Sequence, residues 1–146
     1  MELVVLSYAA GDRPPKRHAI DALAARLGSA PWSAAYVPDS SRDVAPVLQR
    51  LVDVAPEVAS TSDLSGLIAA HVGGRVLAVS SPQAVRELAA EIYDVDRGVV
   101  PLPESGSLTR FRISRSGVRS VVCLNDTLHL AIADDDALPR EDVQVS

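Results

Sequence analysis

Two short stretches of the sequence end an apolar run in hydroxyl-bearing residues that could support chemistry. The first is LVVLSYAAG, residues 3–11, in which the run 3–6 stops at Ser7 and Tyr8. The second is RVLAVSSPQ, residues 75–83, in which a similar run stops at Ser80 and Ser81. An α/β fold places its chemistry where parallel strands end in such residues. We therefore expect Ser7, Tyr8 and Ser81 to lie side by side at one edge of a sheet.

The segment VSSPQ, residues 79–83, has the strand–turn–helix order of a nucleophile elbow. It lacks the flanking glycines of the G-x-S-x-G motif, and no His and Asp partners are evident. The alternative is a helix capped by Ser80 or Ser81, with Pro82 at its first position. We favour the cap over a serine hydrolase.

The residue types that commonly bind metals are scattered along the chain. His18, His71 and His129 lie far apart, and Cys123 is the only cysteine, which leaves no disulfide and no zinc cluster. We expect structural roles for His71, near a helix C-terminus, and for His129. Cys123 lies in the apolar run 121–124 and is expected to be a small buried hydrophobe. We expect no metal site and no cofactor.

The elements that must position these groups alternate along the chain. Apolar runs predict strands at 2–7, 32–37 and 75–80, and a hairpin from 107 to 125 that turns at Ser116–Gly117. Helical spacing predicts helices at 15–27, 44–51, 64–71 and 82–92, the third capped by Thr61 or Ser62. This order predicts one three-layer α/β/α domain, residues 1–130, with a mostly parallel sheet of about five strands. Residues 131–146 are expected to be an acidic, flexible tail.

Several of these segments resemble motifs of the histidine phosphatase superfamily, in particular its phosphoglycerate mutase-like members. VLAVSSPQAVREL, residues 76–88, is similar to VLVVSHGGVIRAL, and CLNDTLHL, residues 123–130, is similar to LNDTAHL. LVVLSYAAG occupies the place of LVLVRHGET. The helical segment 17–27 resembles GRAQAEALAERL, and the segment 34–51, from the second strand to the second helix, lies where the superfamily has AVYSSPLRRARETAEAL. The resemblance runs in the right order from the first strand to residue 130 and implies the fold of that superfamily.

The same resemblance implies that the catalytic groups have been replaced. The nucleophilic histidine of the superfamily falls on Tyr8, and the phosphate-binding arginine before it falls on Ser7. The second catalytic histidine falls on Ser81. Arg42 falls where the second phosphate-binding arginine lies. The resemblance thus makes Ser7, Tyr8, Arg42 and Ser81 the ligand-binding residues of a former phosphate site, without a catalytic residue among them.

These replacements remove the chemistry for physical reasons. A phenol with a pKa of about 10 keeps its proton at neutral pH and cannot replace an imidazole nucleophile. One arginine in place of two arginines and two histidines leaves a transferring phosphoryl group mostly unneutralised. We therefore expect a pseudophosphatase that acts as a binding or protein-interaction module for a weakly bound anion or phosphorylated ligand. One alternative is a phosphatase whose motifs align differently. Another is an enzyme with new chemistry in the former cleft, through Tyr8, Ser81, Arg42 or Asp39.

Composition limits the partners. The chain has 146 residues, 47% of them hydrophobic, and a net charge of −5, which argues against nucleic acid and anionic membranes. It has no signal-peptide pattern and no apolar run of about 20 residues, so we expect a cytoplasmic protein. RFRISRSGVR, residues 110–119, holds four arginines, which we interpret as a solvated strand face rather than a nucleic-acid site. An edge strand there needs protection, and we expect a homodimer.

Overall fold

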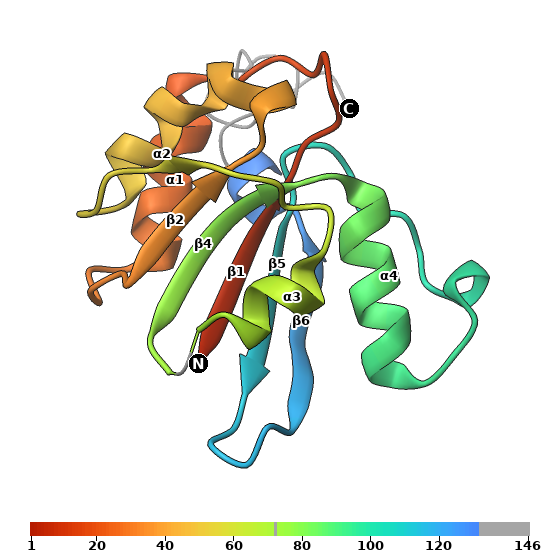
Figure 1. Cartoon of the computed structure of the whole chain (residues 1–146). Helices are drawn as coiled ribbons and strands as arrows, with labels where there is room; N and C mark the ends of the chain where they lie inside the picture. Colours follow the sequence, from red (N-terminus) through yellow and green to blue (C-terminus); the bar gives the residue numbers. More distant parts are fainter. Residues whose placement is uncertain (72, 132–146) are drawn as a thin grey trace.

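The computed structural model describes residues 1–71 and 73–131, and a six-stranded sheet with helices on both faces forms its centre (Figure 1). The strand order is β3-β2-β4-β1-β5-β6. Strands β1 to β4 are parallel, and β5 is antiparallel to both its neighbours. The strands are β1 (Glu2–Ser7), β2 (Ala34–Val37), β3 (Glu57–Val58), β4 (Arg75–Ser80), β5 (Leu108–Ile113) and β6 (Arg119–Asp126). The predicted α/β class and mostly parallel sheet are confirmed, and β3 is an additional strand.

The helices lie in two layers, one on each face of the sheet (Figure 1). One layer holds α1 (Arg17–Leu27) and α2 (Ala45–Leu51), which the 3-10 helix η1 (Asp39–Val44) precedes. The other holds α3 (Leu64–Ala69) and α4 (Pro82–Tyr93), which the 3-10 helix η2 (Arg97–Val99) follows. The expected cap of the third helix was wrong. Asp63, not Thr61 or Ser62, caps α3, because its carboxylate accepts a hydrogen bond of 2.9 Å from the Gly66 N–H.

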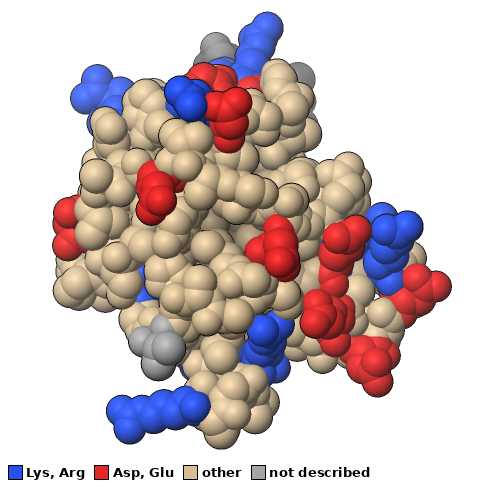
Figure 2. Space-filling model, viewed as in Figure 1, with Lys and Arg blue, Asp and Glu red and all other residues tan. Residues whose placement is uncertain are grey.

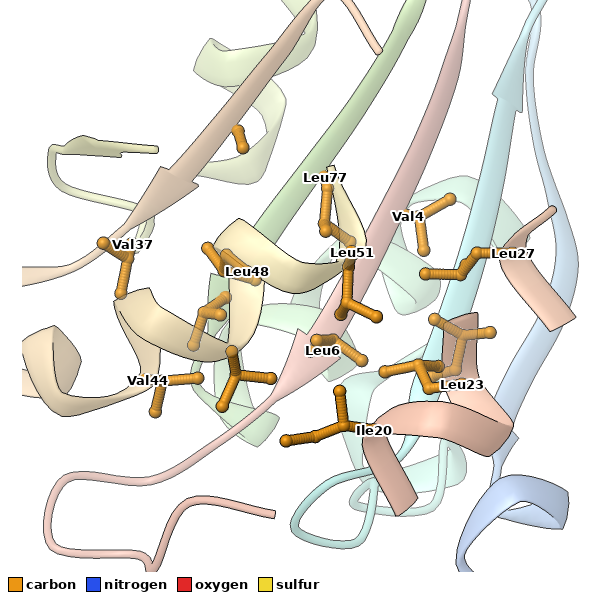
Figure 3. Packing of buried hydrophobic residues seen from close by; sticks show 14 of the residues in the cluster. Val4, Leu6, Ile20, Leu23, Leu27, Val37, Val44, Leu48, Leu51 and Leu77 are labelled. Carbon is orange, nitrogen blue, oxygen red and sulfur yellow. The ribbon is translucent and has the colours of Figure 1, made fainter. Parts of the chain in front are cut away.

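The central strands are apolar throughout because both of their faces are covered. Val4 and Leu6 of β1 belong to the cluster beneath α1 and α2, and Leu3 and Val5 belong to the cluster beneath α3 and α4. Figure 3 shows the first cluster, in which strand side chains meet those of α1, η1 and α2. All six residues of β4 are buried. Coverage on both faces explains why β1 and β4 read as continuous apolar runs, as parallel strands do.

The carboxyl end of β1 is held from two sides. Ser7 pairs with Ser80 of β4, and the Tyr8 N–H donates to the Ser80 carbonyl over 2.9 Å. On the other side, the Gly106 N–H donates to the Ser7 carbonyl over 2.7 Å, and the Ser7 N–H donates to the Ser107 carbonyl over 3.0 Å. Gly106 has a φ of +81°, and this arrangement is a β-bulge of the glycine type. The ends of β1 and β4 are therefore fixed side by side, as expected.

The predicted hairpin is present between β5 and β6, closed by a bond of 2.9 Å from the Ser114 N–H to the Val118 carbonyl. The expectation of a solvated arginine face is correct for Arg112, which is exposed. It is wrong for Arg110, which is half-buried and donates to the Arg26 carbonyl at the end of α1 over 3.1 Å. The aliphatic stem of Arg110 can cover apolar surface while its guanidinium meets polar partners at the sheet edge.

The structure also shows the surroundings of His71, His129 and Cys123, which the sequence had singled out. The Nε2 of His71, just beyond α3, lies 2.8 Å from the Tyr36 hydroxyl. The buried His129 places its Nε2 2.7 Å from the Gly106 carbonyl, and desolvation lowers the pKa of its imidazole. Cys123 was expected to be buried but is only half-buried, because it lies on the edge strand β6, which has a neighbour on one side among the described residues.

Among the described residues, no helix combines the length and the apolar character that crossing a bilayer requires. The acidic tail expected at 131–146 lies outside the described residues, apart from Ala131.

Candidate functional site

A cleft of about 620 Å³ lies at the carboxyl edge of the parallel strands, where β1, β2 and β4 end. Three of the residues singled out from the sequence, Tyr8, Arg42 and Ser81, line this one cleft. Asp39, named for the alternative enzyme, lines it as well. The remaining lining residues are Ala10, Pro38, Ser40, Val58, Ala59, Ser60, Thr61, Ser62 and Ser80.

Ser7 is separate from this group. Its side chain is fully buried, and it is not among the residues that line the cleft. Its hydroxyl has no hydrogen-bond partner among the described residues. In β1 the side chains of successive residues point to opposite faces, and Ser7 follows Leu3 and Val5 toward the α4 side. A ligand in the cleft therefore cannot reach the Ser7 hydroxyl without rearrangement of the strand end.

Tyr8 fills space at the base of the cleft. Only 5% of the residue is exposed, and its ring belongs to the same apolar cluster as Leu6 and Leu108. Its hydroxyl reaches the bulge before β5, where a Cβ placed on Gly106 would lie 3.4 Å from the Tyr8 oxygen. Burial, with a smaller contribution from the Asp12 carboxylate, raises the pKa of the Tyr8 phenol far above its ordinary value. The phenol therefore stays protonated at physiological pH and is a poor nucleophile.

Ser81 caps the helix that points at the cleft. Its hydroxyl accepts a hydrogen bond of 3.1 Å from the Ala84 N–H, and its carbonyl accepts one of 3.2 Å from the Val85 N–H. Pro82 at the first helical position has no N–H to offer. Of the N–H groups in the first turn, only that of Gln83 has no partner within the described residues. The N-terminus of α4 therefore presents fewer free N–H donors to an anion than an uncapped helix end does.

Arg42 brings a cationic side chain to the lining of the cleft. Its Nε donates to the Asp39 carboxylate three residues earlier on η1. Both side chains are well exposed, Arg42 by 67% and Asp39 by 80%. An exposed ion pair of this kind contributes little to stability, so the guanidinium can exchange Asp39 for a ligand at small cost. The pairing also means that the cleft carries no net charge from these two groups.

A pair of reciprocal hydrogen bonds builds the wall of the cleft opposite η1. The Thr61 hydroxyl donates to the Val79 carbonyl over 2.6 Å, and the Ser80 hydroxyl donates to the Thr61 carbonyl over 2.6 Å. Both side chains are buried, and this tie holds the loop 58–62 against the end of β4. This role of Thr61 differs from the predicted one, a helix cap. The signal was the run Ser60-Thr61-Ser62 ahead of a second capping residue, Asp63.

The described lining of the cleft is made mainly of hydroxyl-bearing and small apolar residues, with one arginine and one carboxylate. None of its described lining residues is a histidine, lysine, cysteine or glutamate, and its one carboxylate, Asp39, is paired with Arg42. Within residues 1–71 and 73–131, no group of three or more His, Cys, Asp or Glu side chains is placed to hold a metal ion. The lining offers hydroxyl groups and one arginine, which are hydrogen-bonding groups suited to a polar or anionic ligand.

Comparison with known proteins bears on the fold. No protein family model matches the chain, and no curated protein matches its sequence significantly. Solved structures match it over nearly their whole length. YhfR from Bacillus stearothermophilus superposes with a TM-score of 0.68 at 13% identity, covering 88% of this chain and 98% of YhfR. The fold is that of the histidine phosphatases.

Two further structures with the histidine phosphatase fold give the same result. The protein histidine phosphatase SixA, solved with tungstate, superposes with a TM-score of 0.63 at 14% identity and covers 89% of this chain and 99% of SixA. The α-ribazole phosphatase from Shigella flexneri superposes with a TM-score of 0.62 at 11% identity, with coverage of 86% and 96%. At identities this low, the superpositions establish the fold alone. The function has to be argued from the site itself.

Proposed function

We propose that this protein is a non-catalytic binding module built on the histidine phosphatase fold, a pseudophosphatase. The observation that carries the proposal is the state of Tyr8 in the position that the resemblance assigns to the nucleophile. The ring is buried, and its phenol pKa is raised by burial. A protonated phenol in the apolar cluster is a much weaker nucleophile toward a phosphoryl group than the ring nitrogen of a neutral imidazole.

The ligand class that fits the cleft is a small anion or a phosphorylated side chain held without further chemistry. Arg42 supplies a guanidinium once it leaves Asp39, and Ser60 and Ser62 supply exposed hydroxyls. The Gln83 N–H adds a backbone donor at the start of α4. Few donors and a preexisting ion pair make the binding weak, with a dissociation constant of about 1 mM or higher for inorganic phosphate.

The alternative, an enzyme with new chemistry in this cleft, has less support. Acid–base or nucleophilic catalysis needs a side chain that can accept a proton near neutral pH. Tyr8 holds its proton, and the Ser81 hydroxyl is engaged as a helix cap. Asp39 is the one carboxylate among the described lining residues, and it is well exposed and paired with Arg42. Catalysis here would depend on Asp39, an exposed carboxylate that Arg42 already engages.

Titration of the ¹⁵N-labelled protein with inorganic phosphate, and separately with a phosphoserine peptide and its unphosphorylated form, tests the proposal. We expect saturable amide shifts confined to residues 39–42, 58–62 and 81–84, from phosphate and the phosphopeptide only. The variant Arg42→Ala should weaken binding at least threefold, whereas Arg17→Ala, an exposed arginine on α1, should not. Absence of shifts up to about 50 mM phosphate, or equal shifts from both peptides, would overturn the proposed ligand class.

A further inference from the structure

An exposed apolar segment follows α4, away from the cleft. Four large apolar side chains lie within ten residues and are between 42% and 71% exposed: Tyr93, Val95, Val99 and Leu102. Single exposed apolar residues are ordinary, but a concentration of them marks an interaction surface. None of the four lines the cleft. We call residues 91–102 the acidic–apolar segment, because its charges are mainly negative.

The carboxylates of this segment form hydrogen bonds within the chain but no ion pairs: Glu91 accepts from the Ser65 hydroxyl over 3.4 Å, and Asp96 accepts from the Gly98 N–H over 3.3 Å. Glu91, Asp94 and Asp96 are exposed, and none of them forms an ion pair with a described residue. The one arginine of the segment, Arg97, is already paired with Glu87 at 3.3 Å. The apolar side chains are thus flanked by unpaired carboxylates, which favours a partner surface that is both apolar and basic.

The hairpin between β5 and β6 is such a surface. Arg112 and Arg115 are exposed, Arg119 is partly exposed, and none of the three forms an ion pair with a described carboxylate. Val118 lies among them and is 66% exposed. A hollow of about 500 Å³ beside the hairpin is lined in part by Arg112, Arg115 and Val118. We call residues 112–119 the basic hairpin.

The basic hairpin and the beginning of the acidic–apolar segment, at the C-terminal end of α4, lie toward the same end of the molecule. In Figure 1 the hairpin and the C-terminal end of α4 are both at the bottom, and Figure 2 shows basic groups over the first and acidic groups over the second. A two-fold axis between complementary surfaces on one face satisfies both contacts at once. We propose that two copies of this chain form a symmetric dimer, in which the basic hairpin of each copy docks on the acidic–apolar segment of the other.

Charge complementarity within one chain is the reason to name a second copy as the occupant. Glu91 and Asp96 form no ion pair with a described cation, and Arg112 and Arg115 form none with a described carboxylate, although both sets are carried by the same molecule. Within the chain, the Ser65 hydroxyl joins Arg119 to Glu91: it accepts from the Arg119 guanidinium over 2.5 Å and donates to the Glu91 carboxylate over 3.4 Å. The edge strand β6 continues directly from the basic hairpin, and its Val122 is 48% exposed. A dimer formed at this end would also shield that edge from uncontrolled strand pairing. The proposal does not depend on what the cleft binds.

A charge-swap experiment tests this dimer in the full chain by sedimentation velocity from about 5 to about 500 μM. The wild type should dimerise reversibly. The variants Arg112→Glu/Arg115→Glu and Glu91→Lys/Asp96→Lys should each weaken self-association at least tenfold, because like charges then face one another. An equimolar mixture of the two variants should recover the dimer, since both contacts are again complementary. The control Arg13→Glu/Arg17→Glu, with the same charge change elsewhere, should dimerise like the wild type.

Several results would overturn the proposal. They are a monomeric wild type over the whole range, a dimer that persists in both reversed variants, and a mixture that fails to reassociate although circular dichroism shows both variants folded. The variant Val99→Ser gives an independent check through the apolar contact, and it should weaken the dimer without altering net charge. A monomer that instead binds an arginine-rich peptide at the acidic–apolar segment would assign this surface to another protein and would contradict the second copy.

Discussion

The carboxyl edge of the sheet has two halves that differ in kind. At the end of β1, the Tyr8 ring and the buried Ser7 close the structure, with Gly106 and His129 packed behind them. At the ends of β2 and β4, an open cleft is lined by hydroxyl groups and Arg42, and the Tyr8 ring borders it from the side of β1. The end of β1 is packed into the core, whereas the ends of β2 and β4 border a cavity. The pseudophosphatase that we propose would therefore bind its ligand in the open half and have no nucleophile in the closed half.

The two halves are also stabilised differently. The closed half depends on apolar packing of the Tyr8 ring. It also depends on Gly106, which has no side chain to crowd the Tyr8 hydroxyl. The open half depends on the buried hydrogen bonds between Thr61 and β4, while Arg42 and Asp39 lie exposed at its rim. Loss of a buried aromatic side chain lowers the free energy of unfolding more than loss of a buried hydroxyl does. Loss of an exposed ion pair lowers it least.

The largest effect is expected in the closed half. Tyr8→Ala removes a buried aromatic side chain and should lower the free energy of unfolding by about 3–5 kcal/mol. The phenol oxygen has no hydrogen-bond partner among the described residues, so Tyr8→Phe should cost less than about 1 kcal/mol. Urea unfolding followed by circular dichroism gives both values. Equal losses in the two variants would show that the hydroxyl, rather than the packing of the ring, holds this half together.

The tie in the open half should be the next most sensitive. Thr61→Val keeps the shape but removes the donor to the Val79 carbonyl, and we expect a loss of about 1–3 kcal/mol. Thr61→Ser, which retains the hydroxyl, is the matched control and should lose less. Amide exchange in residues 58–62 should rise in the valine variant alone. A valine variant as stable and as protected as the wild type would mean that the loop is held by other contacts.

A smaller, pH-dependent effect belongs to the closed half. His129 is buried, and burial lowers the pKa of its imidazole in the folded state. Below about pH 6.5 the unfolded chain therefore takes up a proton that the folded chain does not, and stability falls as the pH falls. The free energy of unfolding measured between pH 7.5 and pH 5 should decline less steeply in His129→Gln. Parallel slopes for the two proteins would contradict a neutral, buried His129.

The smallest effect on stability is expected at the rim of the cleft. Arg42→Ala removes one side of an exposed ion pair and should change the free energy of unfolding by less than about 0.5 kcal/mol. The same variant is the one expected to weaken phosphate binding. A stability loss comparable to that of Thr61→Val would place Arg42 in the architecture of the open half rather than at a binding surface.

The sequence allowed much of this edge to be predicted, for reasons that are local. Continuous apolar runs marked β1 and β4, and the pair Ser81–Pro82 marked the start of α4. Parallel strands end at the same edge, so the convergence of Tyr8, Ser81 and Arg42 followed from element order and from the resemblance to the histidine phosphatases. These features depend on periodicity and capping, which short windows of sequence contain.

Other features could not be predicted because they depend on distant partners. Strand β3 has two residues, both exposed, which is too short for a periodic signal. The direction of the Tyr8 ring depends on space beside Gly106, about a hundred residues away in sequence. Thr61 had two plausible uses, a helix cap or a buried donor to β4, and only the approach of β4 decides between them. The engagement of Arg42 by Asp39 likewise required the geometry of η1.

The central claim is that this histidine phosphatase fold performs no phosphoryl transfer. Its most direct test is hydrolysis of p-nitrophenyl phosphate and phosphoglycerates by the purified protein, run beside Tyr8→Phe and Arg42→Ala. We predict that all three proteins release phosphate at the rate of the buffer, because Tyr8 is a buried, protonated phenol. Saturable hydrolysis by the wild type that disappears in Tyr8→Phe or Arg42→Ala would contradict the claim and would make the cleft a working active site.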